Sequence, residues 1–120
     1  MEDRDWLNQI QREEDRYHAY GKKLEESENI REAFARSYRQ QEEVLQEILF
    51  FSKGTETERS AHYELEALAE EQTRDSQHFT HGQEELTERK KEARQRQEEL
   101  EEAYALHKKK EKEGEEKREV

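Results

Sequence analysis

The chain has 120 residues, of which 46% are charged and 28% hydrophobic, and its formal net charge is −11 at pH 7. Such an acidic surface is unsuited to nucleic acids and anionic membranes, and the absence of cysteine excludes disulfides and thiolate catalysis. No apolar run approaches the ~18 residues of a membrane-spanning helix. No signal-peptide core follows the acidic first residues. We therefore expect neither nucleic-acid binding nor membrane insertion.

A long helix is predicted over residues 3–51. Side chains at alternating spacings of three and four residues mark one face of this helix, and nine of the 13 positions on it are apolar or aromatic. We expect this face to form the seam of a helix pair. Its large side chains are Trp6, Ile10, Tyr17, Tyr20, Leu24, Phe34, Tyr38, Leu45 and Ile48.

A turn is predicted near residues 52–56. Gly54 can adopt the left-handed conformation that ends a helix. Thr55 and Glu58 have the spacing of a capping box, in which the Thr55 hydroxyl accepts from the Glu58 N–H and the Glu58 side chain accepts from the Thr55 N–H. The chain therefore ends one helix and starts another near its middle.

The second helix is predicted over residues 56–107. Its seam is thinner, since only five of 14 positions carry a large apolar side chain: Leu65, Leu68, Phe79, Leu86 and Leu100. Residues 108–120 form a highly charged tail, which we expect to be frayed or disordered. The predicted fold is all-α, a coiled-coil-like antiparallel two-helix hairpin that makes one domain over residues 1–107.

Charged seam residues predict the register of this hairpin. If it folds about Gly54, the numbers of facing residues sum to about 106–110. Arg31 then meets Asp75, and Glu13 meets Arg96, so that opposite charges pair and slipped registers are disfavoured.

Several apolar residues lie outside the seam and predict a partner-binding surface. Ile30, Val44 and Phe51 follow one flank of the first helix, with Ser37 between them. Scattered exposed apolar residues are ordinary, but a stripe and a cluster together favour a docking face. The remaining members are Phe50 and Tyr63 near the turn, and Leu7 and Tyr104 at the other end.

Catalysis and cofactor binding find no support. A two-helix hairpin offers no cleft, and the sequence has no nucleophile motif and no glycine-rich phosphate loop. His78 and His81, with Asp75 one turn before, have a spacing that could hold a metal. The first helix lacks a matching motif, so we expect solvated histidines. Gly21 and Gly82 interrupt the helices, and simple tolerance, a close approach of backbones or a bend at a docking point would each explain them.

The residues that carry a family resemblance lie in both predicted helices and the turn. They are the polar segment Gln40–Leu45, the aromatic turn Phe50–Gly54, and the charged segments Gln83–Leu86 and Arg94–Leu100. In these segments, and as a cysteine-free hairpin with a central glycine turn, the chain resembles the WXG-type superfamily of Gram-positive type VII secretion. It is most similar to the small accessory proteins of LXG toxins.

The chain departs from the superfamily pattern in two places. The turn has Phe51 and Gly54 in place of Trp-x-Gly, and Tyr104 is followed four residues later by Lys108 rather than by an acid. The resemblance therefore implies an accessory subunit and not a self-sufficient export substrate. Such a subunit is expected to bind the helical N-terminal domain of an LXG toxin, with a second small helical protein, as a targeting factor or chaperone. The expected location is the cytoplasm, or outside the cell by co-export with the cargo.

A second hypothesis is a structural protein, a self-associating antiparallel coiled coil without a specific cargo. The charged residues in the second seam favour a foreign partner over a copy of the same chain, because self-pairing brings like charges together unless the register avoids it. A homodimer of the protein when alone stays compatible with both hypotheses.

Overall fold

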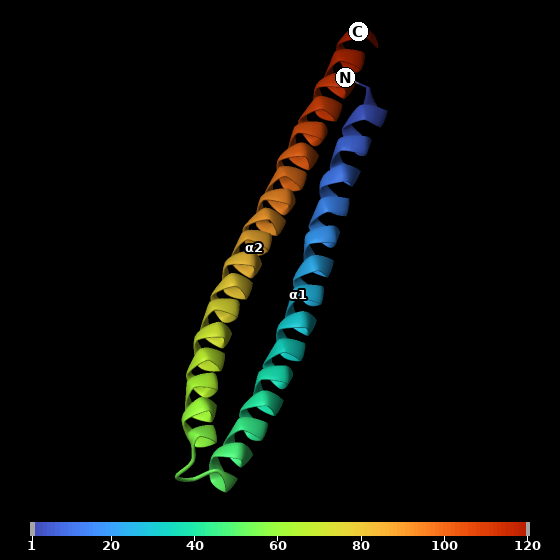
Figure 1. Ribbon diagram of the computed structural model, residues 1–120. Coiled ribbons are helices and arrows are strands. Elements are labelled where there is room, and N and C mark those ends of the chain that lie inside the picture. Colours follow the sequence, from blue (N-terminus) through green and yellow to red (C-terminus); the bar gives the residue numbers. More distant parts are fainter. Residues whose placement is uncertain (1, 120) are drawn as a thin grey trace. The chain divides into compact units, whose positions relative to one another are not determined.

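The computed structural model describes residues 2–119 and has two α-helices, with no β-strand in that range (Figure 1). Helix α1 spans Asp3–Phe51 and helix α2 spans Glu56–Glu119. The predicted all-α two-helix hairpin is confirmed. Contacts divide the chain into two compact units, the terminal unit (residues 1–23 and 85–120) and the turn unit (residues 24–84).

The turn between the helices depends on Gly54, whose φ of 82° lies in the left-handed region. The Gly54 N–H donates to Glu58 Oε2 at 2.6 Å, and both the N–H and the hydroxyl of Thr55 donate to the Ser52 carbonyl. The predicted capping box is therefore wrong in detail. Glu58 reaches one residue further back than expected, and the Thr55 hydroxyl acts as a donor because it satisfies a carbonyl left open after α1.

Within the turn unit, α1 and α2 pack along the seam predicted from the sequence. Tyr38, Ala61 and Leu68 are buried, and the rings of Phe34 and Phe79 lie 5.5 Å apart. The half-buried seam residues of this unit are Leu24, Leu45, Leu65 and Phe79. Phe34 and Ile48 depart from the prediction, since both are exposed.

Within the terminal unit the seam buries no large apolar side chain completely. Its buried residues are Ala93, Glu13 and Gln97, and small or polar residues at these positions bring the helices together without a large apolar core. The Trp6 ring lies 6.2 Å from that of Tyr104 and 5.8 Å from that of His107. The half-buried seam residues are Trp6, Ile10, Tyr17, Tyr20, Leu86 and Leu100.

The predicted pair of Arg31 and Asp75 is not formed. Asp75 accepts a hydrogen bond from the Tyr38 hydroxyl, while Arg31 donates to Gln83 at 2.9 Å and to the hydroxyls of Ser76 and Thr80. The reason is the register. The residue numbers of Tyr38 and Asp75 sum to 113, so α2 is shifted by about one helical turn relative to the predicted pairing.

The predicted pair of Glu13 and Arg96 is also not formed. Glu13 pairs with Arg16 on its own helix at 2.9 Å, and Arg96 lies 3.8 Å from Glu92 on α2. Residues three or four apart on a helix are adjacent, so each charge finds a local partner at less cost in side-chain entropy than a partner across the seam.

The tail differs from its prediction, because α2 continues to Glu119 instead of fraying from residue 108. This segment has helix-forming Lys and Glu residues at a spacing that supports a helix without a core. His107 lies 3.1 Å from Glu111, and Lys108 lies 4.0 Å from the same carboxylate. Val120 lies outside the described residues.

Candidate protein-interaction surface

The turn unit carries a second ladder on α1, which we call the outer ladder. Its positions alternate by four and three residues along the helix, as the seam of a coiled coil does. Its apolar side chains are exposed by fractions that run from 38% for Ile48 to 83% for Phe51. The outer ladder consists of Ile30, Phe34, Ser37, Gln41, Val44, Ile48 and Phe51.

The outer ladder is uncharged in a chain that is 46% charged. By the helical period, Ala33, Gln40 and Glu47 flank it on the side away from α2. Glu47 is the only charge among these ladder and flank positions. An exposed, uncharged and apolar helical face of this length is what a helix-binding surface requires.

Two polar residues interrupt the outer ladder at its middle. Gln41 Nε2 donates to Ser37 Oγ at 3.2 Å, so the two side chains satisfy each other in the isolated chain. Polar residues at seam positions restrict which registers a helix pair can adopt. The surface therefore combines apolar ends with a polar centre that can select a partner.

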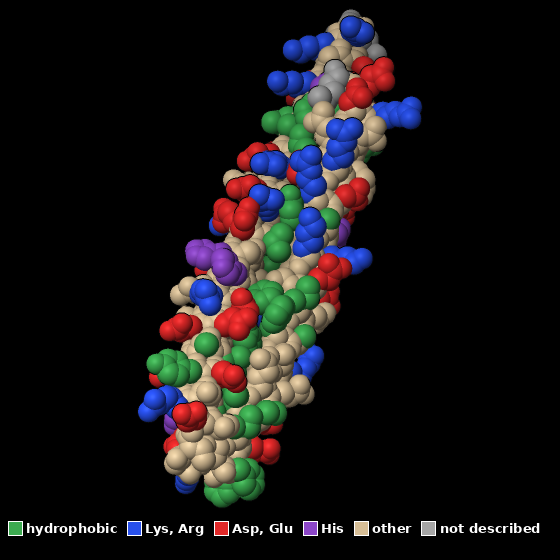
Figure 2. Space-filling view, viewed as in Figure 1, with side chains coloured by type: hydrophobic (Ala, Val, Ile, Leu, Met, Phe, Trp, Pro, Cys, Tyr) green, Lys and Arg blue, Asp and Glu red, His purple; other side chains and the backbone are tan. Residues whose placement is uncertain are grey.

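Aromatic residues extend the apolar surface around the turn. The rings of Phe50 and Phe51 are 5.1 Å apart and nearly perpendicular, and Lys53 Nζ lies 5.6 Å from the Phe50 ring. Phe50 and Tyr63 are exposed. Figure 2 shows hydrophobic side chains reaching the surface at this end of the molecule. The predicted turn cluster is thus open to solvent.

The two remaining predicted members, Leu7 and Tyr104, belong to the terminal unit. Leu7 is exposed, but Tyr104 is half-buried because its ring packs beside Trp6. The candidate surface of the turn unit therefore does not include these two residues. Leu106 is an exposed apolar residue that sequence reasoning missed.

Phe34 and Ile48 were expected in the hairpin seam, yet together with Gln41 they complete the outer ladder. Phe34 and Ile48 lie at the edge of the seam, so they touch α2 only in part and leave 45% and 38% of their surfaces exposed. The spacing of four and three residues from Ile30 to Phe51 is the sequence signal that identifies them.

The electrostatic environment alters the acidity of two tyrosines. The hydrogen bond to Asp75, with burial second, raises the pKa of Tyr38 to about 12. In the terminal unit, the hydrogen bond from Arg94, with the charge of Lys90 second, lowers the pKa of Tyr17. Arg94 Cζ and Lys90 Nζ lie 3.9 Å and 4.8 Å from the Tyr17 ring centroid, an arrangement typical of cation–π packing between neighbouring helices.

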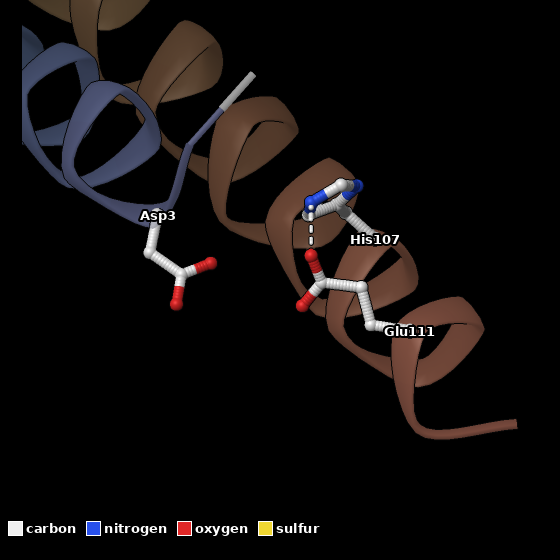
Figure 3. Close-up of side chains that lie close together, drawn as sticks. All are labelled: Asp3, His107 and Glu111. Atoms are coloured by element: carbon white, nitrogen blue, oxygen red, sulfur yellow. Dashed lines mark ion pairs between the residues drawn. The ribbon is translucent and has the colours of Figure 1, made fainter. Parts of the chain in front are cut away.

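One cluster of potential metal ligands occurs among the described residues. Asp3, His107 and Glu111 have ligand atoms within 4.8 Å of one another, and Figure 3 shows them gathered between the start of α1 and the end of α2. Lys108 donates to Asp3 and lies 4.0 Å from Glu111, so its ammonium group already neutralises these carboxylates. The hydrogen bond to Asp3 raises the pKa of Lys108. We interpret the cluster as an ion-pair network that joins the two helices.

The other chemical candidates from the sequence do not assemble. His78 and His81 are exposed and do not form a metal-ligand group with Asp75. A Cβ added at Gly82 would meet nothing within 4 Å, and one at Gly21 would make only ordinary contact with the Lys90 side chain. These glycines therefore do not mark a close approach of backbones within the chain.

Comparison of the chain with protein-family models, with curated proteins and with solved structures finds no match. In the part of the chain that the structure describes, neither helix is long and apolar enough to cross a membrane. The outer ladder is therefore the feature of the molecule that bears on its function.

Proposed function

We propose that this protein is a non-catalytic binding subunit that docks a helical segment of another protein on the outer ladder. The observation that carries the proposal is the exposed, uncharged ladder from Ile30 to Phe51 on an otherwise highly charged chain. Exposing such a surface to water costs free energy that a partner can recover. The thin seams add to this, since a hairpin with few buried large residues gains stability from any ligand that binds its folded form.

The partner is a helix because the ladder has the geometry of a helix seam. Positions at alternating spacings of four and three residues accept the side chains of a second helix between them. A β-strand or an irregular peptide would instead need unpaired backbone groups, and a helix face offers none.

The resemblance to accessory proteins of LXG toxins supplies the identity of this partner. On this proposal the chain binds the helical N-terminal domain of an LXG toxin in the cytoplasm, together with a second small helical protein. It acts there as a targeting factor or chaperone for type VII secretion and can be exported with its cargo. The all-α hairpin and the exposed ladder support this proposal, because both suit assembly into a larger helical bundle.

The proposal is tested by co-purification of the chain with the N-terminal domain of an LXG toxin encoded beside it. Val44→Asp and Phe51→Asp place a charge on the outer ladder and should abolish the complex, while the helical circular dichroism signal of each variant stays as in the wild type. Leu106→Asp is the matched control, since Leu106 is as exposed as Val44, at 56%, but lies in the terminal unit. Binding that survives both ladder substitutions would remove the outer ladder as the docking surface.

A further inference from the structure

We propose that, without a foreign partner, two copies of this chain pair through the outer ladder, with their α1 helices antiparallel. The inference concerns the same surface as the proposed function and names what covers it in the free protein. It needs only the turn unit, where every member of the ladder lies. The hairpin itself stays intact, because α2 remains on its own side of α1.

The sequence of the outer ladder is complementary to itself when reversed. We consider an antiparallel pair in which the numbers of facing residues sum to about 78. Each ladder position that is followed by a three-residue step then faces a position that is followed by a four-residue step, as in the seam of an antiparallel coiled coil. Ile30 then faces Ile48 of the second copy, and Phe34 faces Val44. Ser37 faces Gln41. Apolar side chains therefore face apolar side chains, and the polar side chains of one copy face the polar side chains of the other.

The polar centre then has partners across the interface. In the single chain Gln41 Nε2 donates to Ser37 Oγ at 3.2 Å. In the pair, Gln41 of each copy lies opposite Ser37 of the other, and the amide and hydroxyl can exchange hydrogen bonds in a symmetric arrangement. Shifting the register by one heptad would place Ser37 against Ile48 and Gln41 against Val44, which leaves buried polar groups without partners.

The charges beside the ladder agree with the antiparallel arrangement. In the antiparallel pair Glu47, the one charge on the flank away from α2, lies beside the uncharged Ala33 of the second copy. A parallel pair in register would also place apolar ladder residues against apolar ones and polar ladder residues against polar ones. It would align the dipoles of the two α1 helices, which is unfavourable and which the antiparallel pair avoids.

The proposed pair does not bring the charged residues of the α2 seam together. Arg89 and Arg96 belong to that seam, and it lies outside the interface between the two copies. The contact surface is formed by α1 alone, on the face where ladder positions carry no charge. The symmetric pair closes on itself, so it yields a dimer and not a filament.

Sedimentation equilibrium of the full-length chain over a range of concentrations is the first test. We expect a reversible monomer–dimer equilibrium. Val44→Glu places a carboxylate opposite Phe34 twice in each dimer and should weaken self-association by ~100-fold or more. Leu106→Glu, the matched control in the terminal unit, should leave the equilibrium unchanged, and circular dichroism should show both variants fully helical. A chain that stays monomeric at all concentrations overturns the inference, as does a dimer that Val44→Glu leaves intact.

Cysteine cross-linking tests the orientation, since the natural chain has no cysteine. An equal mixture of Ile30→Cys chains and Ile48→Cys chains, distinguishable by an affinity tag, is oxidised. The antiparallel pair should give disulfide-linked dimers that contain one chain of each kind, because positions 30 and 48 face each other. Dimers linked between identical sites would show a parallel pair and overturn the inference.

These tests separate the inference from the proposed function. A monomeric wild type that still captures the toxin domain through Val44 and Phe51 refutes self-pairing and leaves the proposed function standing. A dimer with the predicted cross-links that never binds the toxin domain refutes the proposed function and leaves self-pairing standing.

Discussion

Tyr38 on α1 donates the hydrogen of its hydroxyl to the carboxylate of Asp75 on α2. This contact joins the two helices in the middle of the turn unit, where Tyr38 is 6% exposed. It takes the place of the ion pair expected there between Arg31 and Asp75. The register of the hairpin is therefore held at this level by a neutral donor on a carboxylate, and Arg31 is left to bind three uncharged side chains of α2.

Replacement of Tyr38 by Phe should lower the melting temperature of the hairpin. The variant keeps the buried ring but leaves the Asp75 carboxylate beside an apolar edge without its donor. We expect a decrease on the order of 4 °C, measured by circular dichroism at pH 7. Gln72→Ala, at an exposed position beside the seam, provides the comparison. An unchanged melting temperature would show that the hydrogen bond contributes nothing to stability.

Alkaline pH should weaken the same contact. The pKa of Tyr38 is raised from 10.0 to about 12 in the folded chain, so the protonated form is stabilised by folding. This contribution is fully present below about pH 10 and is lost as the pH rises through about 12. The difference in melting temperature between the wild type and Tyr38→Phe should therefore shrink from pH 9 to pH 12. Tyr17, whose pKa is lowered, has the opposite effect on the pH dependence of stability. Because both proteins contain Tyr17, its contribution cancels in the difference.

Two glycines should respond to alanine in opposite directions. Gly54 has a φ of 82°, so Gly54→Ala forces a side chain into the left-handed region and should destabilise the hairpin by ~1 kcal/mol. Gly82 lies inside α2 with nothing within 4 Å of an added Cβ, so Gly82→Ala should stabilise it by up to ~1 kcal/mol. Urea unfolding measures both. Equal signs for the two variants would contradict the assigned conformation of one of them.

The fold was predictable because it depends on periodicity and on one glycine. The spacing of Trp6, Leu24 and Tyr38 defines a helical face without any tertiary information, and Gly54 marks the only left-handed break among residues 2–119. The register was not predictable to better than one turn. Charged side chains such as Arg31 are long enough to reach several positions on α2, and a simple pairing of opposite signs does not take neutral donors such as the Tyr38 hydroxyl into account.

The candidate surface was predictable only in part. Ile30, Val44 and Phe51 stood out because they lie away from the seam, whereas Phe34 and Ile48 fit both the seam and the outer ladder. Sequence spacing alone does not decide how far such edge residues turn towards solvent, because that depends on the crossing geometry of the two helices. Tyr104 was misplaced because its packing partner, Trp6, lies almost the whole length of the sequence away.

The charged segment after residue 107 should behave as helix in solution. The structure continues α2 to Glu119, although the composition of this segment is typical of a disordered tail. NMR Cα chemical shifts of residues 108–116 should show the displacement typical of helix, decreasing towards residue 119 as the end frays. Random-coil shifts from residue 108 onward would restore the disordered tail and would place the end of the helix near the ion-pair network of His107 and Lys108.

The polar centre of the outer ladder should limit self-association while it selects the register of the pair. Replacing Ser37 with Ala and Gln41 with Leu makes the ladder apolar throughout, which should tighten the dimer by ~10-fold or more, because buried polar residues at seam positions reduce stability. The same change removes the pairing that distinguishes one register from another. Sedimentation equilibrium should show the tighter dimer, and the yield of disulfides between positions 30 and 48 should decrease as other registers become populated. A weaker dimer would mean that the Ser37–Gln41 contacts hold the interface together instead of selecting its register.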